Sequence, residues 1–369
     1  MRKNHLSPEL EGEILSNFRI PSGEYTLVPY GSGHINDTLL AGNGKGDRYI
    51  FQRINNNIFQ DVPALMGNIL RVTEFLQDSV RKNGGDPRRE SLTVIRTVDN
   101  APYYQDREGG YWRAYLFVED TVCRDRAETA EEFAQSGEAF GRFQKLLADF
   151  PADSLAETIP DFHNTPKRFE AFLDAIQKDP LGRKKEVERE IEFLLARRED
   201  MSRLTEALRK GELPLRVTHN DTKLNNVLLD RETLRGICVI DLDTVMPGLS
   251  VNDFGDSIRF GASTAPEDEQ DLSKVEMSLS LFRAYAEGFL RGCDGRLTEN
   301  EYACLPLGAK TMTMECGMRF LTDYLLGDTY FKTHRPGQNL DRCRTQLKLV
   351  ADMEGKWAEM ERIISECRG

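Results

Sequence analysis

The first part of the chain alternates apolar and polar side chains in short runs, a spacing typical of strands. One stretch, residues 61–80, instead repeats its apolar positions every three or four residues, which predicts an amphipathic helix. Asp61 suits the cap of this helix and Pro63 its first turn. Strands are predicted over residues 25–40, as a pair joined by a turn at 31–33, and over 48–54, 92–98 and 111–118.

The remainder of the chain keeps helical spacing over long stretches, with two short strands at residues 227–229 and 236–240. Helices are predicted over residues 128–150, 165–178, 184–210, 268–290, 299–326 and 340–367. We therefore expect an α+β fold in two lobes: an antiparallel sheet with one helix in residues 1–118, and a larger helical lobe in residues 119–369. A short hinge at residues 118–121 would join them, an arrangement that resembles the protein kinases.

Composition narrows the class of protein. The chain has 369 residues, of which 30% are charged, and a net charge of −12. An acidic chain without a Lys/Arg-rich run is not expected to bind nucleic acid or an anionic membrane. No apolar run of membrane-spanning length and no signal core near Met1 is found. The seven Cys form no CxxC pair, so we expect neither zinc nor disulfides, and a cytoplasmic protein. Oligomeric state is not indicated.

One motif carries the spacing of a phosphoryl-transfer site: His219-Asn220-Asp221-Thr222-Lys223-Leu224-Asn225-Asn226. Asp241 follows at the end of an apolar strand. In such a site one carboxylate orients a hydroxyl and takes its proton, while an amide and a second carboxylate hold Mg²⁺ against a nucleotide. Asp221 is therefore a candidate general base, with an Asx-turn as the alternative. Asn226 and Asp241 are candidate Mg²⁺ ligands, with a turn residue and a capping or ion-paired residue as their alternatives.

The neighbours of these residues each have alternative roles. Asp243 either shares the metal or binds a helix N-terminus. Lys223 either reaches the γ-phosphate of ATP or is a solvated surface residue. For His219 we favour a structural role, in which it braces the loop through hydrogen bonds to the backbone.

The turn Gly31-Ser32-Gly33 lies between two predicted strands, where glycines let backbone amides approach phosphate oxygens. Arg53 is the candidate cation for the α- and β-phosphates, with Gln52 as the alternative in register. Glu74 on the following helix either pairs with that cation or is exposed. His34 and Asn36 either line the cleft or hold the glycine turn.

The motif H-x-D-x-x-x-x-N, followed by a strand and I-D-x-D, resembles the aminoglycoside phosphotransferase/choline kinase superfamily. Four segments look closest to the N-acetylhexosamine 1-kinases: Gly31-Ser32-Gly33-His34-Ile35-Asn36-Asp37, Tyr49-Ile50-Phe51-Gln52-Arg53-Ile54-Asn55, residues 219–226, and Arg319-Phe320-Leu321-Thr322-Asp323-Tyr324-Leu325. The resemblance implies ATP and Mg²⁺ as cofactors and phosphorylation of the anomeric C1 hydroxyl of N-acetylglucosamine or N-acetylgalactosamine. It implies Asp221 as base and Asn226 and Asp241 on Mg²⁺.

The same resemblance places Arg319 and Tyr330 in the sugar pocket, with His34 close by. Arg319 could instead pair with Asp323 one turn further along its helix. Tyr330 either packs against a sugar ring or belongs to the core. Two other functions stay open: a kinase for another small alcohol (an aminoglycoside, choline or homoserine), or an inactive nucleotide-binding module.

Overall fold

The computed structural model describes residues 6–31, 35–44 and 46–368. Its N-terminal part is built on a six-stranded sheet in the order β1-β2-β3-β6-β4, with β5 paired to β6 and every pair antiparallel. These strands are β1 (Thr26–Pro29), β2 (Asp37–Gly42), β3 (Tyr49–Ile54), β4 (Val94–Ile95), β5 (Tyr104–Gln105) and β6 (Tyr111–Leu116). The predicted sheet is confirmed, although β4 is shorter than predicted and β5 was missed.

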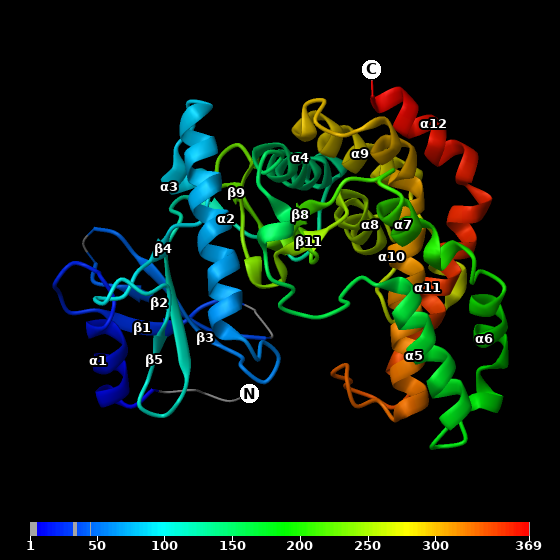
Figure 1. The fold of residues 1–369 in the computed structure, drawn as a ribbon, viewed down its shortest axis with the longest axis horizontal. Coiled ribbons are helices and arrows are strands. Elements are labelled where there is room, and N and C mark those ends of the chain that lie inside the picture. The colour runs from blue at the N-terminus through cyan, green and yellow to red at the C-terminus, as the bar shows by residue number, and fades with distance from the viewer. Residues whose placement is uncertain (1–5, 32–34, 45, 369) are drawn as a thin grey trace.

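Two helices cover this sheet. Helix α1 (Pro8–Ser16) buries Leu10 and Ile14 against Phe51 and its neighbours on one face. Helix α2 (Val62–Lys82) packs its apolar stripe toward the other face and the rest of the protein (Figure 1). The Asp61 carboxylate accepts a hydrogen bond from the backbone of Ala64 at 2.9 Å, so the predicted cap is confirmed.

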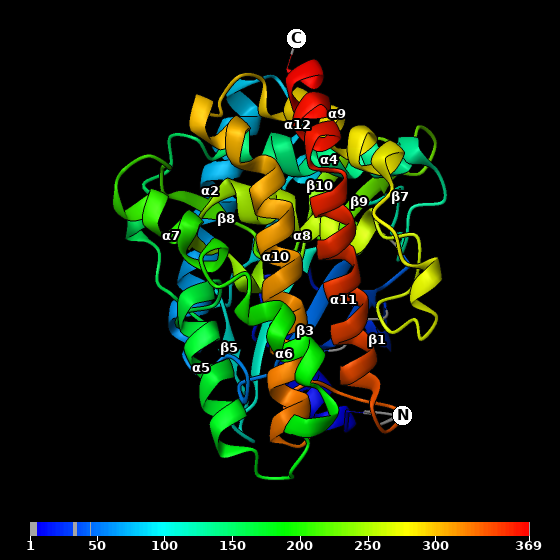
Figure 2. The same cartoon turned by 90° about the vertical axis from the view of Figure 1, so that its right-hand side faces the viewer.

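The rest of the chain is mainly helical (Figure 2). Its larger helices are α4 (Ala130–Leu146), α5 (Thr165–Lys178), α6 (Glu188–Leu195), α7 (Asp200–Arg209), α8 (Ser250–Gly261), α9 (Leu279–Cys293), α10 (Glu299–Leu326), α11 (Gln338–Gly355) and α12 (Trp357–Cys367). Helix α3 (Pro87–Glu90) and five 3₁₀ turns are short: η1 (Ala152–Ser154), η2 (Lys184–Glu186), η3 (Leu224–Asn226), η4 (Leu242–Thr244) and η5 (Leu272–Lys274). Within the described residues no helix is long and apolar enough to cross a bilayer.

Two small antiparallel sheets carry the motif residues. One has the order β10-β9-β7 and the other pairs β11 with β8. Their strands are β7 (Thr121–Val122), β8 (Arg216–Thr218), β9 (Val227–Asp230), β10 (Gly236–Val239) and β11 (Met246–Gly248). Since β7 already pairs with β9, the chain joins the C-terminal elements directly after the proposed boundary between residues 118 and 119. That boundary stays a proposal.

Helices α4 and α9 pack with their backbones almost in contact. A Cβ atom on Gly141 would lie 2.1 Å from the carbonyl oxygen of Phe289, and one on Gly288 would lie 2.0 Å from that of Ala134. Only glycine fits at such separations. The close packing holds α4 in place, and the side chains of α4 in turn support the motif loop described below.

Three helix predictions were wrong in their extent. Residues 184–210 do not form one helix, because a turn at residues 196–199 separates α6 from α7 and the 3₁₀ turn η2 precedes α6. The stretch 340–367 is divided near Lys356 into α11 and α12, and the helix predicted from residue 268 begins only at Leu279. Helix α8 was missed altogether. Val251, Phe254 and Ile258 recur in α8 at helical spacing, but its polar residues, Asp253 and Asp256 among them, are buried as well, so the helix has no solvent-facing side.

Candidate active site

Residues 219–226, the catalytic loop, connect β8 to β9 and are held from below by α8. The Asp253 carboxylate accepts hydrogen bonds from the backbone N–H groups of His219 at 2.9 Å and Asn220 at 2.8 Å. The Asp256 carboxylate accepts one from the N–H of Thr222 at 3.0 Å. Our sequence reasoning missed both residues. Two Asp one turn apart in an otherwise buried segment were the available signal.

His219 braces the loop, as predicted. Its ring is fully buried and meets the edges of Phe140 and Phe143 on α4. Nε2 lies 2.8 Å from the carbonyl oxygen of Ile240, and Nδ1 accepts a hydrogen bond from the backbone of Asp221 at 3.3 Å. His219 therefore ties the catalytic loop to the end of β10.

The catalytic loop brings three of the predicted side chains together. Lys223 Nζ lies 2.7 Å from Asp221 Oδ1. Asn226 Nδ2 donates to Asp221 Oδ2 at 3.1 Å and to the Asp221 carbonyl at 2.8 Å. Because the amide nitrogen of Asn226 is used in this way, its Oδ1 points elsewhere, and no described residue donates a hydrogen bond to it.

Asp241 lies opposite these residues. The backbone N–H of Ile240 donates to the carbonyl of Asn226 at 2.9 Å, so the two segments run side by side. Asp241 has a left-handed backbone (φ 60°), and no hydrogen bond or ion pair to its carboxylate occurs in the described part of the chain. Although the side chain reaches solvent, the surrounding protein weakens hydration of its charge and raises its pKa to about 6, with repulsion from Asp243 and Asp221 adding to the effect.

These observations provide a test of whether a metal fits. Asp241 and Asn226 present a carboxylate and an amide oxygen that lack protein partners among the described residues. Hard oxygen donors of this kind are the ligands that Mg²⁺ prefers, usually with water and phosphate oxygens completing the shell. A divalent cation would also offset the burial and the repulsion by Asp243 and Asp221 that raise the pKa of Asp241. The donor set therefore fits Mg²⁺.

Asp243 is occupied by protein contacts. It forms a buried ion pair with Arg113 on β6, and its Oδ2 accepts a hydrogen bond from Asn36 Nδ2 at 2.6 Å. Burial opposes the charge of Arg113, but the attraction of Asp243 outweighs it and keeps the pKa of Arg113 above its ordinary value. Metal ligation by Asp243 stays a prediction that these contacts do not favour.

Asn36 links the two parts of the protein. Besides donating to Asp243, it accepts a hydrogen bond through Oδ1 from the backbone of Asn55 at 2.9 Å. Neither contact is with the glycine turn, so lining the cleft and holding the turn both stay predictions for Asn36. Gly31 has a positive φ of 76°, which suits glycine. The other predicted residues of this turn, Ser32, Gly33 and His34, lie outside the described residues.

The structure does not place Arg53 beside the catalytic loop. Arg53 shares the face of β3 that Phe51 presents to α1, because alternate residues of a strand point the same way. Gln52 is on the opposite face, where its Oε1 accepts a hydrogen bond from Arg113 Nε at 2.9 Å. The strand cation on the side of Asp243 is therefore Arg113. Glu74, the partner considered for Arg53, pairs with Arg96 at 2.5 Å.

Arg319 lies on α10 among three aromatic rings, those of Phe162, Tyr330 and Phe331. Its guanidinium carbon is 5.6, 5.8 and 5.5 Å from the respective ring centres, and Nη2 approaches the Tyr330 hydroxyl at 3.5 Å. We call these four residues the Arg319 cluster. Tyr330 is 69% exposed, so it is not a core residue.

The alternative ion pair between Arg319 and Asp323 does not form. The Asp323 carboxylate instead accepts hydrogen bonds from the backbone of residues 329–331 and from Asn339. Asp323 therefore fixes the loop that carries Tyr330 and Phe331. Most N–H donors of Arg319 have no protein acceptor among the residues described.

A row of charged groups leads from the catalytic loop toward the Arg319 cluster. Burial raises the pKa of Asp256, but its ion pair with Arg259, together with Lys223 and His163, outweighs burial and lowers it. Burial likewise raises the pKa of Glu315, and His163 and Arg319 outweigh it and lower that pKa. His163 thus influences both Asp256, which holds the catalytic loop, and Glu315, which Arg319 also influences.

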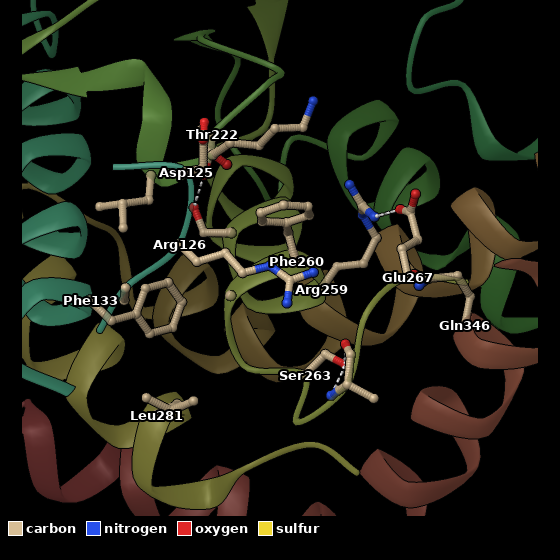
Figure 3. A pocket seen from close by; sticks show the side chains of 16 residues that line it. Asp125, Arg126, Phe133, Thr222, Arg259, Phe260, Ser263, Glu267, Leu281 and Gln346 are labelled. Carbon is tan, nitrogen blue, oxygen red and sulfur yellow. Dashed lines mark hydrogen bonds and ion pairs between the residues drawn. The ribbon is translucent and has the colours of Figure 1, made fainter. Parts of the chain in front are cut away.

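A cavity of about 210 Å³ lies next to the catalytic loop on the side of Lys223. Figure 3 shows the Arg126 side chain extending into it, with Arg259 and Glu267 paired at 2.8 Å on its far wall. Phe133 and Leu281 form its apolar side. The active site therefore has free space beside Lys223.

An antiparallel sheet beside a loop with a candidate catalytic carboxylate, followed by a strand that ends in a second acidic residue, is an arrangement typical of the protein-kinase-like fold. The chain belongs to the phosphotransferase enzyme family APH, whose model matches residues 26–288. The predicted superfamily and fold class are thereby confirmed, whereas specificity for N-acetylhexosamines is not established by this match.

Solved structures show the same fold at low sequence identity. A microcompartment-associated aminopropanol kinase is 15% identical, with 96% of this chain and 98% of that chain covered and a TM-score of 0.59. An aminoglycoside phosphotransferase from Alicyclobacillus acidocaldarius is 14% identical, with 99% of both chains covered and a TM-score of 0.61. Choline kinase from Cryptosporidium parvum is 13% identical, with 94% and 93% covered and a TM-score of 0.55.

Proposed function

We propose that this protein is an ATP- and Mg²⁺-dependent small-molecule kinase that phosphorylates the anomeric C1 hydroxyl of N-acetylglucosamine or N-acetylgalactosamine. One observation carries the chemistry: Asp221, oriented by Lys223 and Asn226, lies across from the unpartnered carboxylate of Asp241. Nucleotide use is also supported by relatives of the same fold, such as a spectinomycin phosphotransferase described in complex with ADP.

Asn226 Oδ1 and Asp241 would hold Mg²⁺. When bound, the ion neutralises charge on the phosphate oxygens of the nucleotide. Arg113 stays with Asp243 and positions the loop that carries Asp241. Gly31 and the residues after it would cover the phosphates.

Asp221 orients the acceptor hydroxyl toward the γ-phosphate and accepts its proton. Lys223 holds the Asp221 carboxylate in place, and its pKa is raised, because attraction by Asp221 and Asp256 outweighs burial. Lys223 therefore stays charged and is close enough to the base to neutralise charge on the transferred group. An anomeric hydroxyl is more acidic than an ordinary sugar hydroxyl, which suits a carboxylate base.

The charges of the proposed acceptor site favour a neutral molecule. Burial and the nearby charge of Arg319 lower the pKa of Arg168, so two guanidinium groups lie close together there. The buried carboxylate of Glu315 is already bonded to His163 and Thr165. A cationic alcohol would meet net positive charge, whereas an acetylated sugar offers carbonyl and hydroxyl oxygens to Arg319 and a ring face to Tyr330.

A second candidate is a kinase for a cationic alcohol, since relatives of the same fold include choline and aminopropanol kinases. ADP release with MgATP should be measured over N-acetylated amino sugars, neutral sugars, choline, aminopropanol and aminoglycosides. We expect turnover with the N-acetylhexosamines and formation of the 1-phosphate, identified by phosphorus NMR. Turnover with the cationic alcohols alone would establish the second candidate, and no turnover with any acceptor would point to an inactive module.

A further inference from the structure

We propose that His163 accepts a hydrogen bond through Nε2 from the amide N–H of the acceptor, and that Glu315 fixes the imidazole for this task. The inference rests on the proposed function, because it assigns a partner to the acetamido group of the sugar. His163 is a specificity-determining residue that the sequence motifs did not indicate.

The carboxylate of Glu315 sets the tautomer of His163. Glu315 Oε1 lies 2.9 Å from His163 Nδ1, and Oε2 accepts a hydrogen bond from Thr165 at 2.6 Å. The Glu315 side chain is only 1% exposed; burial raises its pKa, but His163, with Arg319 and Thr165, outweighs burial and lowers it. An ionised carboxylate only accepts hydrogen bonds, so Nδ1 carries a proton, and in the neutral form of the ring Nε2 is then the acceptor.

Nε2 of His163 is buried and has no hydrogen-bond partner among the residues described. A buried polar atom without a partner is costly, so such atoms usually mark a place where a ligand or water binds. The two oxygens of Glu315 contact Nδ1 of His163 and the hydroxyl of Thr165. Nε2 therefore remains available to accept a hydrogen bond from a group outside the protein.

His163 adjoins the Arg319 cluster. Its ring is 4.6 Å from that of Phe162, centre to centre, and the guanidinium of Arg319 is 5.6 Å from the same Phe162 ring. Glu315 and Arg319 are one turn apart on α10, so their side chains leave the same face of the helix.

This arrangement combines an acceptor at His163 with donors at Arg319. An acetamido group presents the complementary pair, an N–H and a carbonyl oxygen that point in opposite directions within one plane. A quaternary ammonium group, as in choline, has no N–H for Nε2 and would also face Arg319. The pair therefore selects for a neutral amide rather than for a sugar ring in general.

The variant His163→Asn tests the inference, because the Asn amide can still donate to Glu315 from near the position of Nδ1 while Nε2 is removed. We expect KM for N-acetylglucosamine to rise roughly three- to tenfold, the scale of one neutral hydrogen bond. KM for ATP and the melting temperature should stay close to wild type. A purely structural role would instead lower the melting temperature without separating the two KM values.

An analogue provides the matched control. Glucose esterified with acetate at O2 keeps the carbonyl for Arg319 but lacks the N–H, so wild type and His163→Asn should use it with the same KM. Equal KM values of both proteins for N-acetylglucosamine would overturn the role of His163 and leave the proposed function intact. Wild-type protein that turns over neither N-acetylhexosamine would reject both proposals.

Discussion

Arg113 and Asp243 form a buried ion pair that joins β6 of the N-terminal sheet to the loop after β10. The Arg113 side chain is 1% exposed and that of Asp243 is 5% exposed. Two further hydrogen bonds complete the pair: Asn36 Nδ2 donates to Asp243 Oδ2, and Gln52 Oε1 accepts from Arg113 Nε. The position of Asp241, two residues before Asp243, thus depends on a strand about 130 residues earlier in the sequence.

Breaking this pair should destabilise the protein strongly. Arg113→Met leaves the Asp243 charge buried without a cation, which typically costs about 3–5 kcal/mol of unfolding free energy. Urea unfolding measures the change. The exposed pair between Arg48 and Glu119 is the control, and Arg48→Met should cost less than about 1 kcal/mol. Equal losses in the two variants would show that the buried pair has no special role.

Asp221→Asn should lower kcat by roughly two or more orders of magnitude, the usual effect of removing a general base, with little change in fold. The Asn side chain keeps the size of Asp221 but neither accepts the proton nor attracts Lys223. Steady-state kinetics with circular dichroism would separate chemistry from folding. Asp125→Asn, beside the cavity but outside the catalytic loop, is the control. Near-normal turnover of Asp221→Asn would reject this residue as the base.

Asp241 should link metal binding to pH. Its pKa is raised to about 6, so its ionised form disfavours folding in the absence of metal. This cost is absent below the unfolded pKa, about 4, and complete above pH 6. Asp241→Asn should therefore raise the melting temperature of EDTA-treated protein at about pH 7.5 and leave it nearly unchanged at about pH 4.

The same variant should lose the stabilisation by Mg²⁺ with ADP that we expect of wild type. In wild type this stabilisation should shrink as the pH falls below about 6, because a proton then competes with the metal for Asp241. Differential scanning fluorimetry with and without MgADP measures both effects. An unchanged metal-dependent shift in Asp241→Asn would remove this residue from the metal site.

Asp253→Ala should disorder the catalytic loop, because Asp253 on α8 holds this loop in place. It removes the acceptor of two backbone hydrogen bonds, to His219 and Asn220, and leaves both N–H groups buried without partners. We expect a loss of about 1–3 kcal/mol for each unpaired group and a lower kcat. Hydrogen exchange at residues 219–226 should rise. Unaltered exchange there would contradict the anchoring role.

Arg319→Lys should weaken acceptor binding although the charge is kept. Lysine lacks the planar fork of donors and stacks less well among the rings of Phe162, Tyr330 and Phe331. KM for the acceptor should rise roughly tenfold, the effect of one lost charged hydrogen bond, while KM for ATP is unaffected. Equal changes in both KM values would place Arg319 outside the acceptor site.

Local sequence patterns were sufficient to predict many of the elements of this protein. Helix α2 with its Asp61 cap and helix α5 follow from spacing and capping residues that lie within one or two turns of each other. The trio Asp221, Asn226 and Asp241 was recognisable for the same reason, because the motif is nearly continuous in the chain. The sequence by itself therefore determined the fold class and the residues proposed to carry the chemistry.

The tertiary structure decided the partners of these residues. Helix α8 is buried on all sides, and only the fold shows that its Asp253 holds the catalytic loop. The register of β3 and β6 decided that Arg113 rather than Arg53 faces Asp243. His163 meets Glu315 across 152 residues. Burial and ion pairing act through space, so a contact between distant segments leaves no periodic trace along the chain.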